Sequence, residues 1–238
     1  MRNAIVLCSG GLDSVITAHY VKKKLKHDSM TVLFFDYGQR SIKEERKCAL
    51  ICAKELKAEF VELALPELGN ISTSLINKPG KVQKVQRKDL RDTSKEGNKW
   101  YVPCRNVVFL SYALALAESL YVKKKFESEI FVGFKNEGIE NFPDTSKEFV
   151  EEFNDMSKVA CKKRFRIIAP LIKKDKEDIV QLGEKLRVNF TKTFSCYVGK
   201  GKHCGVCLAC RLRQEGFYWA NVSDPTAYKE KMKDFRRA

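Results

Sequence analysis

The stretch AIVLCSGGLDSV, residues 4–15, joins an apolar run to a pair of glycines and then to a helical segment. Ala4–Leu7 has the composition of a buried strand, and Asp13–Lys24 that of the helix after it. Each glycine inside regular structure costs about 0.5–1 kcal/mol relative to alanine. We therefore expect that the backbone at Gly10 and Gly11 must approach something closely.

The residue types of this stretch predict an anion site. Ser9, Gly10 and Gly11 let consecutive N–H groups point into one concavity, and the following helix adds its positive N-terminal end. Asp13 and Ser14 fall in the first helical turn, where side-chain oxygens can cap N–H groups. The stretch matches neither the Walker A spacing nor the dinucleotide-binding G-x-G-x-x-G. The alternative is a glycine-rich turn that binds nothing.

Apolar runs alternate with helical segments along most of the chain. This alternation predicts an α/β fold with a mostly parallel, doubly wound sheet, whose ligands bind at the carboxyl ends of the strands. The SIKE motif at residues 41–44 and the pair Thr145 and Glu148 each fit a capping box at a helix start. The expected strands are 4–7, 30–36, 59–63, 128–134 and 166–171, and the expected helices are 13–24, 41–57, 106–120, 145–160 and 176–186.

Composition predicts two parts. Residues 1–190 are expected to form the α/β domain, and residues 191–238 a small metal-binding segment with a basic tail. Within the first part, residues 77–99 are polar and basic without a strong period, which indicates a mobile insert. This insert is interpreted either as an exposed loop or as a lid over a substrate.

The chain has 238 residues and a formal net charge of +15. A basic surface attracts nucleic acids, nucleotides or other acidic partners, although a solvated lysine-rich surface is the alternative. No apolar run is long enough to cross a membrane, and the apolar stretch near the N-terminus is too short for a secretory signal. We therefore expect a cytoplasmic location and no membrane partner.

Four of the nine cysteines crowd into one short segment, as Cys196, Cys204, Cys207 and Cys210. The C-x7-C-x2-C-x2-C spacing predicts one structural zinc ion per chain, held tetrahedrally by four thiolates. An iron–sulfur cluster is the alternative, since four cysteines also hold one. His203 could replace a cysteine, but four thiolates already fill the coordination sphere, so we expect His203 to flank the site.

The SGGLDS motif after a first strand resembles the pyrophosphate loop of the N-type ATP pyrophosphatases. The resemblance implies ATP as a substrate, cleaved between the α- and β-phosphates, and a magnesium ion that bridges the phosphates. It also places adenine against the second strand, near Phe34 and Phe35. The nucleotide-binding residues that it implies are Cys8, Ser9, Gly10, Gly11, Leu12, Asp13, Ser14 and Val15, together with Phe34 and Phe35.

The loop and the cysteine motif together narrow the resemblance to the 7-cyano-7-deazaguanine synthase family of queuosine precursor synthesis. Further motifs carry it nearly end to end: FDYGQR (35–40), VPCRNVVFLS (102–111), FPD (142–144), APL (169–171) and TFSCY (193–197) with CGVCLACRLR (204–213). The implied reaction adenylates 7-carboxy-7-deazaguanine and releases pyrophosphate. Ammonia then displaces AMP, and a second ATP activates the resulting amide, which loses AMP to leave a nitrile.

The resemblance also implies residue roles and a homodimer. Ser9, Asp13, Ser14 and Arg105 are the expected catalytic residues, with Arg105 holding substrate or phosphate oxygens. The alternative for Arg105 is a structural salt bridge. The expected substrate-binding residues are Arg105, Asn106, Gly133, Phe142 and Asp144.

The sequence departs from the family around the expected deazaguanine pocket. Cys104 stands where the family has glycine, Gly138 where it has an acidic residue, and Phe142 and Thr145 where it has tyrosine and cysteine. Cys104 is expected to fill the small buried space that a glycine would leave. These changes motivate a second hypothesis, in which the acid is transferred to an amine of a protein or nucleic acid. A third hypothesis is a nucleic-acid-binding zinc protein without catalysis.

Overall fold

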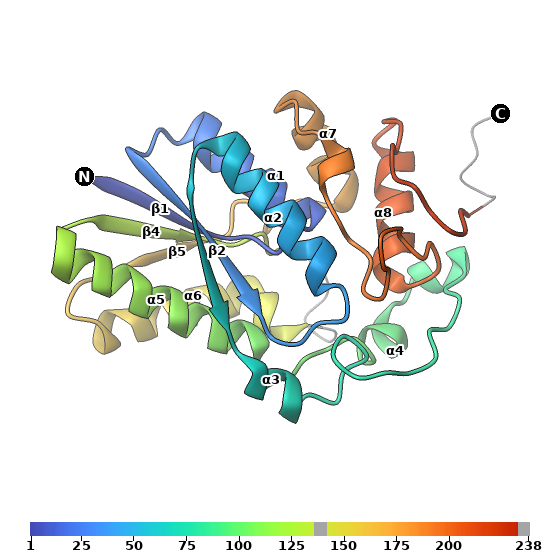
Figure 1. Cartoon of the computed structure of the whole chain (residues 1–238), viewed down its shortest axis with the longest axis horizontal. Helices are drawn as coiled ribbons and strands as arrows, with labels where there is room; N and C mark the ends of the chain where they lie inside the picture. Colours follow the sequence, from blue (N-terminus) through green and yellow to red (C-terminus); the bar gives the residue numbers. More distant parts are fainter. Residues whose placement is uncertain (136–141, 233–238) are drawn as a thin grey trace.

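The computed structural model describes residues 1–135 and 142–232. Their centre is a five-stranded sheet of order β3-β2-β1-β4-β5, in which every neighbouring pair is parallel (Figure 1). The strands are β1 (Arg2–Leu7), β2 (Ser29–Asp36), β3 (Glu59–Ala64), β4 (Glu127–Phe131) and β5 (Arg166–Ile168). The predicted parallel sheet is confirmed. The fourth and fifth strands end earlier than predicted, because residues 132–135 and 169–171 leave the ladder at its carboxyl end.

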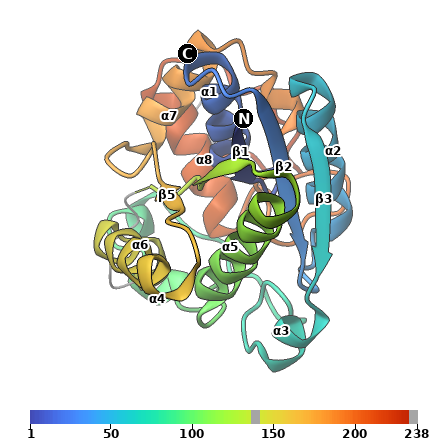
Figure 2. The same ribbon diagram turned by 90° about the vertical axis from the view of Figure 1, so that its left-hand side faces the viewer.

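Helices cover both faces of the sheet, as the doubly wound prediction requires. The helices α1 (Leu12–Lys24), α2 (Ile42–Leu56) and α7 (Lys176–Lys185) lie on one face, with α8 (Leu208–Trp219) beside α7. The helices α5 (Arg105–Lys124) and α6 (Lys147–Ala160) cover the other, as the end view in Figure 2 shows. The shorter elements are α3 (Pro66–Ile71), α4 (Ser94–Gly97), η1 (Arg87–Leu90), η2 (Pro143–Thr145) and η3 (Phe190–Lys192).

Alternate strand residues supply the two halves of the core. Ile5 and Leu33 are fully buried on the α5 side, whereas Val6 and Val32 are fully buried on the α1 and α2 side. Successive side chains of a strand point to opposite faces, and both faces of a parallel sheet are covered. This two-sided burial explains why the central strands β1 and β2 contain unbroken apolar runs.

Neither predicted capping box forms. Ser41 is the N-cap of α2, but its hydroxyl donates to Glu45 Oε1 at 2.6 Å and does not cap the helix. The N-cap of α6 lies one residue later than expected, and Ser146 Oγ accepts from the N–H of Phe149 at 3.0 Å. Thr145 belongs to η2, where its hydroxyl donates to the carbonyl of Phe142 at 2.8 Å. The hydroxyls of Ser41 and Thr145 therefore donate to a carboxylate and a carbonyl, and they do not accept from helix N–H groups as the motifs predict.

The basic insert (residues 77–99) contacts the C-terminal part of the chain that carries the four clustered cysteines (residues 191–232, the cysteine segment). Val85 is 3% exposed, and its N–H donates to the carbonyl of Val206 at 3.1 Å. The cysteine segment also returns to the first strand's loop, where the N–H of Phe194 donates to the carbonyl of Gly10 at 2.9 Å. The mobility of residues 77–99 stays a prediction. Within residues 1–135 and 142–232, no helix has the length and apolarity needed to cross a membrane.

Candidate active site and metal centre

The loop between β1 and α1 owes its shape to Gly10. Gly10 has φ +77°, and a Cβ there would lie 2.4 Å from the carbonyl oxygen of Glu45 on α2. Gly11 is the N-cap of α1 at φ −72°, and no side chain caps the helix there. Gly10 therefore serves close packing against α2, and the start of α1 at Gly11 keeps its backbone donors for the expected approach of phosphate.

The side chains of the first turn do not cap α1, contrary to expectation. Ser14 Oγ donates to the carbonyl of Gly11 at 3.1 Å and lies 3.3 Å from Ser9 Oγ. The Asp13 carboxylate accepts from Lys176 Nζ at 2.7 and 2.9 Å. Lys176 comes from α7, and the two side chains are only 16% and 23% exposed. This ion pair places a cation beside the loop. In Walker-type loops the lysine belongs to the motif itself, whereas here it comes from a distant helix.

A cavity of about 280 Å³ opens at the carboxyl ends of the strands, between this loop and α5. It joins the predicted nucleotide residues to the predicted substrate residues. Its predicted lining residues are Cys8, Ser9, Gly11, Leu12, Asp13, Ser14, Phe35, Arg105, Asn106, Gly133 and Phe142, and Thr145 also lines it. Gly10, Val15, Phe34 and Asp144 do not. The position agrees with the rule for ligand sites in open parallel sheets.

The two adjacent phenylalanines of β2 lie on opposite faces of the sheet. Phe35 lines the cavity, and its ring stacks on Phe109 of α5 at a centroid distance of 4.2 Å. Phe34 is 1% exposed on the α2 side and stacks on Phe60 at 6.0 Å. Because strand neighbours alternate, only one of the pair can reach the cavity. Phe34 therefore contributes to packing, and Phe35 is left as the aromatic candidate for contact with adenine.

Arg105 opens α5 and lies over aromatic rings at the cavity wall. Its Nη1 donates to the hydroxyl of Tyr37 at 3.3 Å, and its guanidinium carbon lies 5.8 Å from the ring centroids of both Tyr37 and Phe109. Burial lowers the pKa of Arg105, but Tyr37 and Asp144 outweigh it and leave the pKa raised. No ion pair joins Arg105 to a carboxylate in the part of the chain that the structure describes. Within those residues Arg105 makes no structural salt bridge, and its contact with substrate or phosphate oxygens stays a prediction.

Asn106 and Asp144 bind one another. Asp144 Oδ2 accepts from the N–H of Asn106 at 3.0 Å, and Asn106 Nδ2 donates to the carbonyl of Asp144 at 3.1 Å. Asp144 is 7% exposed, and its carboxylate accepts from a backbone N–H in the first turn of α5, where a negative charge is favourable. The predicted contact of these two residues with substrate remains a prediction.

The structure corrects the expectation for Cys104. Cys104 is exposed and is the N-cap of α5 at φ +53°, so it fills no buried space. A positive φ explains why a glycine suits the position, since glycine adopts this conformation without steric cost. The other altered position, Gly138, and the neighbouring Glu137 and Glu140 lie outside the described residues.

Sequence reasoning missed several side chains of the cavity, namely Tyr37, Gln39, Glu45, Trp100, Lys135, Lys176, Tyr197 and Arg213. Burial raises the pKa of Glu45, against the opposing hydrogen bonds from Ser41 and Gln39. Three of the missed residues, Tyr37, Gln39 and Tyr197, lie in the FDYGQR and TFSCY motifs. The sequence therefore marked these positions as family motifs but assigned them no function. Lys176 follows the fifth strand, and its approach to the loop depends on tertiary structure alone.

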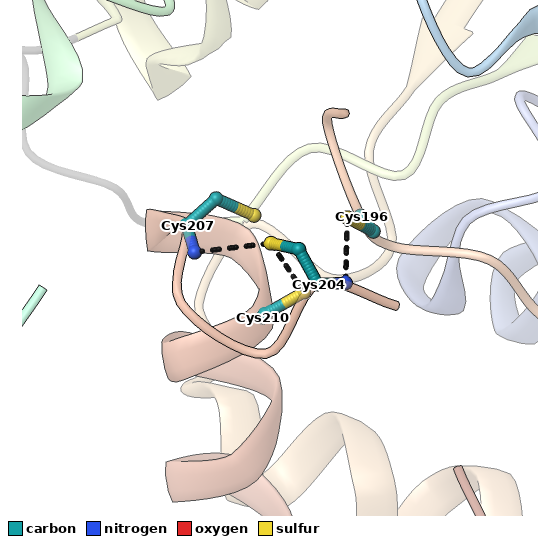
Figure 3. A group of neighbouring side chains, drawn as sticks. All are labelled: Cys196, Cys204, Cys207 and Cys210. Carbon is teal, nitrogen blue, oxygen red and sulfur yellow. Dashed lines mark hydrogen bonds between the residues drawn. The ribbon is translucent and has the colours of Figure 1, made fainter. Parts of the chain in front are cut away.

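The four cysteines form a compact cluster (Figure 3). Their sulfur atoms all lie within 4.8 Å of one another, and Cys204 Sγ lies 3.9 Å from Cys210 Sγ. Four sulfurs at about 2.3 Å from a tetrahedral Zn²⁺ are about 3.8 Å apart. Backbone N–H groups also donate to the sulfurs, from Cys204 to Cys196 at 3.3 Å and from Cys207 to Cys204 at 3.3 Å. The donor set and its spacing therefore fit a closed metal site.

His203 lies beside this cluster and is not one of the grouped ligands. Its Nε2 accepts from the N–H of Ser195 at 3.0 Å, and its ring packs between Phe194 and Tyr228. Burial lowers the pKa of His203 to about 4, so the ring is neutral near pH 7. The predicted flanking position of His203 is confirmed.

Comparison with known proteins identifies the family. The model of the queuosine biosynthesis protein QueC matches residues 3–221. The chain belongs to the QueC family. Two relatives named 7-cyano-7-deazaguanine synthase support this QueC assignment over their full length. The protein of Methanosphaera stadtmanae is 37% identical over 95% of this chain and 98% of its own, and that of Methanobrevibacter smithii is 35% identical over 96% and 99%.

Solved structures similar to this QueC chain include a U34-tRNA thiolase from Methanococcus maripaludis and an NMN synthetase from Francisella tularensis. The first has a TM-score of 0.48 and 14% identity, over 90% of this chain and 63% of the other. The second has a TM-score of 0.42 and 15% identity, over 93% and 78%.

Proposed function

We propose that this QueC-family protein is a 7-cyano-7-deazaguanine synthase, an ATP-dependent ligase of queuosine biosynthesis, with the cavity described above as its active site. One observation carries the residue assignment. The same cavity is bounded by the glycine loop at one wall and by Arg105 among aromatic rings at another. A reaction between ATP and a planar, anionic heterocycle needs such a pair of neighbouring subsites.

The first half of the proposed reaction activates the substrate carboxylate. Its oxygen attacks the α-phosphorus of ATP, the bond between the α-phosphorus and the bridging oxygen breaks, and pyrophosphate leaves. The backbone donors at the start of α1 and the cation of Lys176 stabilise the charge that develops on the leaving group. Arg105 holds substrate or phosphate oxygens, so that the carboxylate faces the α-phosphorus.

The second half replaces oxygen by nitrogen. Ammonia attacks the acyl carbon, AMP leaves, and a proton lost from nitrogen gives the amide. The amide oxygen then attacks the α-phosphorus of a second ATP, the bond between the α-phosphorus and the bridging oxygen breaks, and a second pyrophosphate leaves. Cleavage of the C–O bond releases AMP, and loss of the two remaining protons from nitrogen leaves the nitrile. Two ATP molecules are therefore consumed per nitrile. Glu45 lies on the cavity wall, and burial raises the pKa of its carboxyl group. It is the carboxylate best placed to accept a proton from the nucleophile.

Two metal ions belong to the proposal. Cys196, Cys204, Cys207 and Cys210 would hold the zinc ion, which would stabilise the C-terminal segment and take no part in the chemistry. For magnesium, no cluster of three or more carboxylates occurs among residues 1–135 and 142–232, and Asp13 is paired with Lys176. We expect magnesium to bind mainly through the phosphates of ATP. Assembly as a homodimer is a further prediction.

The test is incubation of the zinc-loaded protein with 7-carboxy-7-deazaguanine, ATP, magnesium and ammonium, followed by mass spectrometry. The expected products are 7-cyano-7-deazaguanine and two AMP per nitrile. AMP without the nitrile, or a deazaguanine mass added to protein or RNA, would move the assignment to the hypothesis of a changed acceptor. Salt-sensitive binding of nucleic acid without any ATP turnover would favour the third hypothesis.

A further inference from the structure

Trp100 lies at the end of the insert and forms part of the cavity wall. It is 2% exposed, and its ring packs on Tyr197 of the cysteine segment at a centroid distance of 4.8 Å. The backbone on either side is held as well: the N–H of Trp100 donates to the carbonyl of Gly97, and the carbonyl of Lys99 accepts from the N–H of Leu75, each at 2.9 Å. The indole is therefore fixed in place before any ligand arrives.

The polar atom of this indole lacks a partner. Trp100 Nε1 is buried, and it finds no hydrogen-bond acceptor within residues 1–135 and 142–232. Buried donors are nearly always paired in native proteins, so an unpaired one in a cavity wall needs a partner from outside the described chain, and a bound ligand can supply it. Because an indole N–H can only donate, the missing partner is an oxygen or an unprotonated ring nitrogen.

We propose that Trp100 is a specificity-determining residue whose Nε1–H donates a hydrogen bond to an acceptor atom of the bound deazaguanine. This inference rests on the proposed function and assigns a residue to its heterocycle subsite. The phosphates already have the loop and Lys176 as partners, whereas Trp100 comes from the end of the insert and packs on Tyr197. The heterocycle offers a ring carbonyl oxygen and ring nitrogens as acceptors.

The kinetic test compares two tryptophan variants. The chain has two tryptophans, and Trp219 is 55% exposed and outside the cavity. Trp100→Phe keeps an aromatic ring and removes the donor, so KM for 7-carboxy-7-deazaguanine should rise about three- to tenfold, the usual effect of one neutral hydrogen bond. The KM for ATP should stay unchanged. Trp219→Phe, the matched control, should leave both constants unchanged.

A binding measurement on the intact site keeps the test independent of folding. In the ¹⁵N-labelled wild-type protein the two indole N–H resonances are distinguished with Trp219→Phe. Adding 7-carboxy-7-deazaguanine without ATP should move the Trp100 resonance downfield, as a new hydrogen bond does. An unmoved resonance at saturating ligand, or an unchanged KM in folded Trp100→Phe, would overturn the inference. If the wild-type protein makes no nitrile and the resonance still moves, the proposed function fails while Trp100 remains a ligand contact.

Discussion

Replacing Gly10 by alanine tests the interpretation that this glycine serves close packing against α2. The substitution forces a residue with a Cβ into φ +77°, which costs about 1–2 kcal/mol. The added methyl group would also lie 2.4 Å from the carbonyl oxygen of Glu45 and 2.9 Å from Cys48 Cβ. Such overpacking costs about 1–3 kcal/mol. The expected loss in the free energy of unfolding is therefore about 2–5 kcal/mol.

The assay is unfolding in guanidinium followed by far-UV circular dichroism, with thermal unfolding as a second measurement. For a domain of this size the expected loss corresponds to a fall in Tm of roughly 4–20 °C. The matched control is Gly11→Ala. Gly11 has φ −72°, and a Cβ there would lie 3.2 Å from Ser9 Oγ and 3.8 Å from the Phe194 carbonyl oxygen.

The control should retain stability to within about 1 kcal/mol, because alanine accepts this backbone conformation and Ser9 can move. It should still weaken ATP binding, since the added methyl group lies where phosphate approaches the backbone. A Gly10→Ala protein that unfolds at the same guanidinium concentration as the wild type would refute the packing argument. So would a Gly11→Ala protein that loses as much stability as Gly10→Ala.

Three further predictions concern charge, metal and pH. Lys176→Met should lower kcat/KM for ATP by about 10–100-fold through the loss of a charged hydrogen-bond donor, and Lys176→Arg should retain part of the wild-type value. Equal kcat/KM for the wild type and Lys176→Met in steady-state kinetics would exclude the role of Lys176. Cys207→Ser should reduce bound zinc from about one ion per chain to near zero and lower Tm, which metal analysis and calorimetry measure; full zinc content would contradict the assigned ligand set. His19 is 5% exposed, and burial, with a smaller contribution from Lys23, lowers its pKa from 6.5 to about 4. The folded state holds this imidazole neutral, so the free energy of unfolding is unaffected by His19 above pH 6.5 and falls as pH drops toward 4. The expected fall between pH 7 and pH 5 is about 2 kcal/mol. Glu55 lies 3.8 Å from His19 Nε2, too far for a hydrogen bond, so the neutral ring prevails. His19→Leu should flatten the urea midpoint over this range, and an unaltered slope would show that another group titrates.

The sequence predicts the layers of this fold well because local patterns determine them. The central strands β1 and β2 are apolar runs, helices such as α2 and α6 repeat apolar residues at the helical period, and the alternation of strands and helices is typical of a parallel sheet. The exact caps are less predictable. Ser146 caps α6 although Thr145, with Glu148 three residues later, is the residue that fits the capping-box motif, because the hydroxyl of Thr145 donates to the carbonyl of Phe142. Competing acceptors of this kind come from the folded chain.

The site is predictable where one motif holds all of its atoms, as in the loop at residues 8–15 and in the cysteine cluster. It is less so where distant segments meet. Lys176 and Trp100 reach the cavity from α7 and from the end of the insert, and no local pattern marks them. The choice between Phe34 and Phe35 also needs the structure, because both faces of the sheet are apolar and the alternation gives no preferred face.

The contact between Gly10 and Phe194 has a consequence for the order in which the protein matures. A ribosome finishes the phosphate loop early, but the segment that lies on it is made near the end of synthesis. Arg213, which also lines the cavity and binds Thr193 and Ser195, follows later still. A nascent chain therefore has the nucleotide motif long before it has the complete cavity. The cavity is complete only after Arg213 has been translated and this segment has docked on the loop.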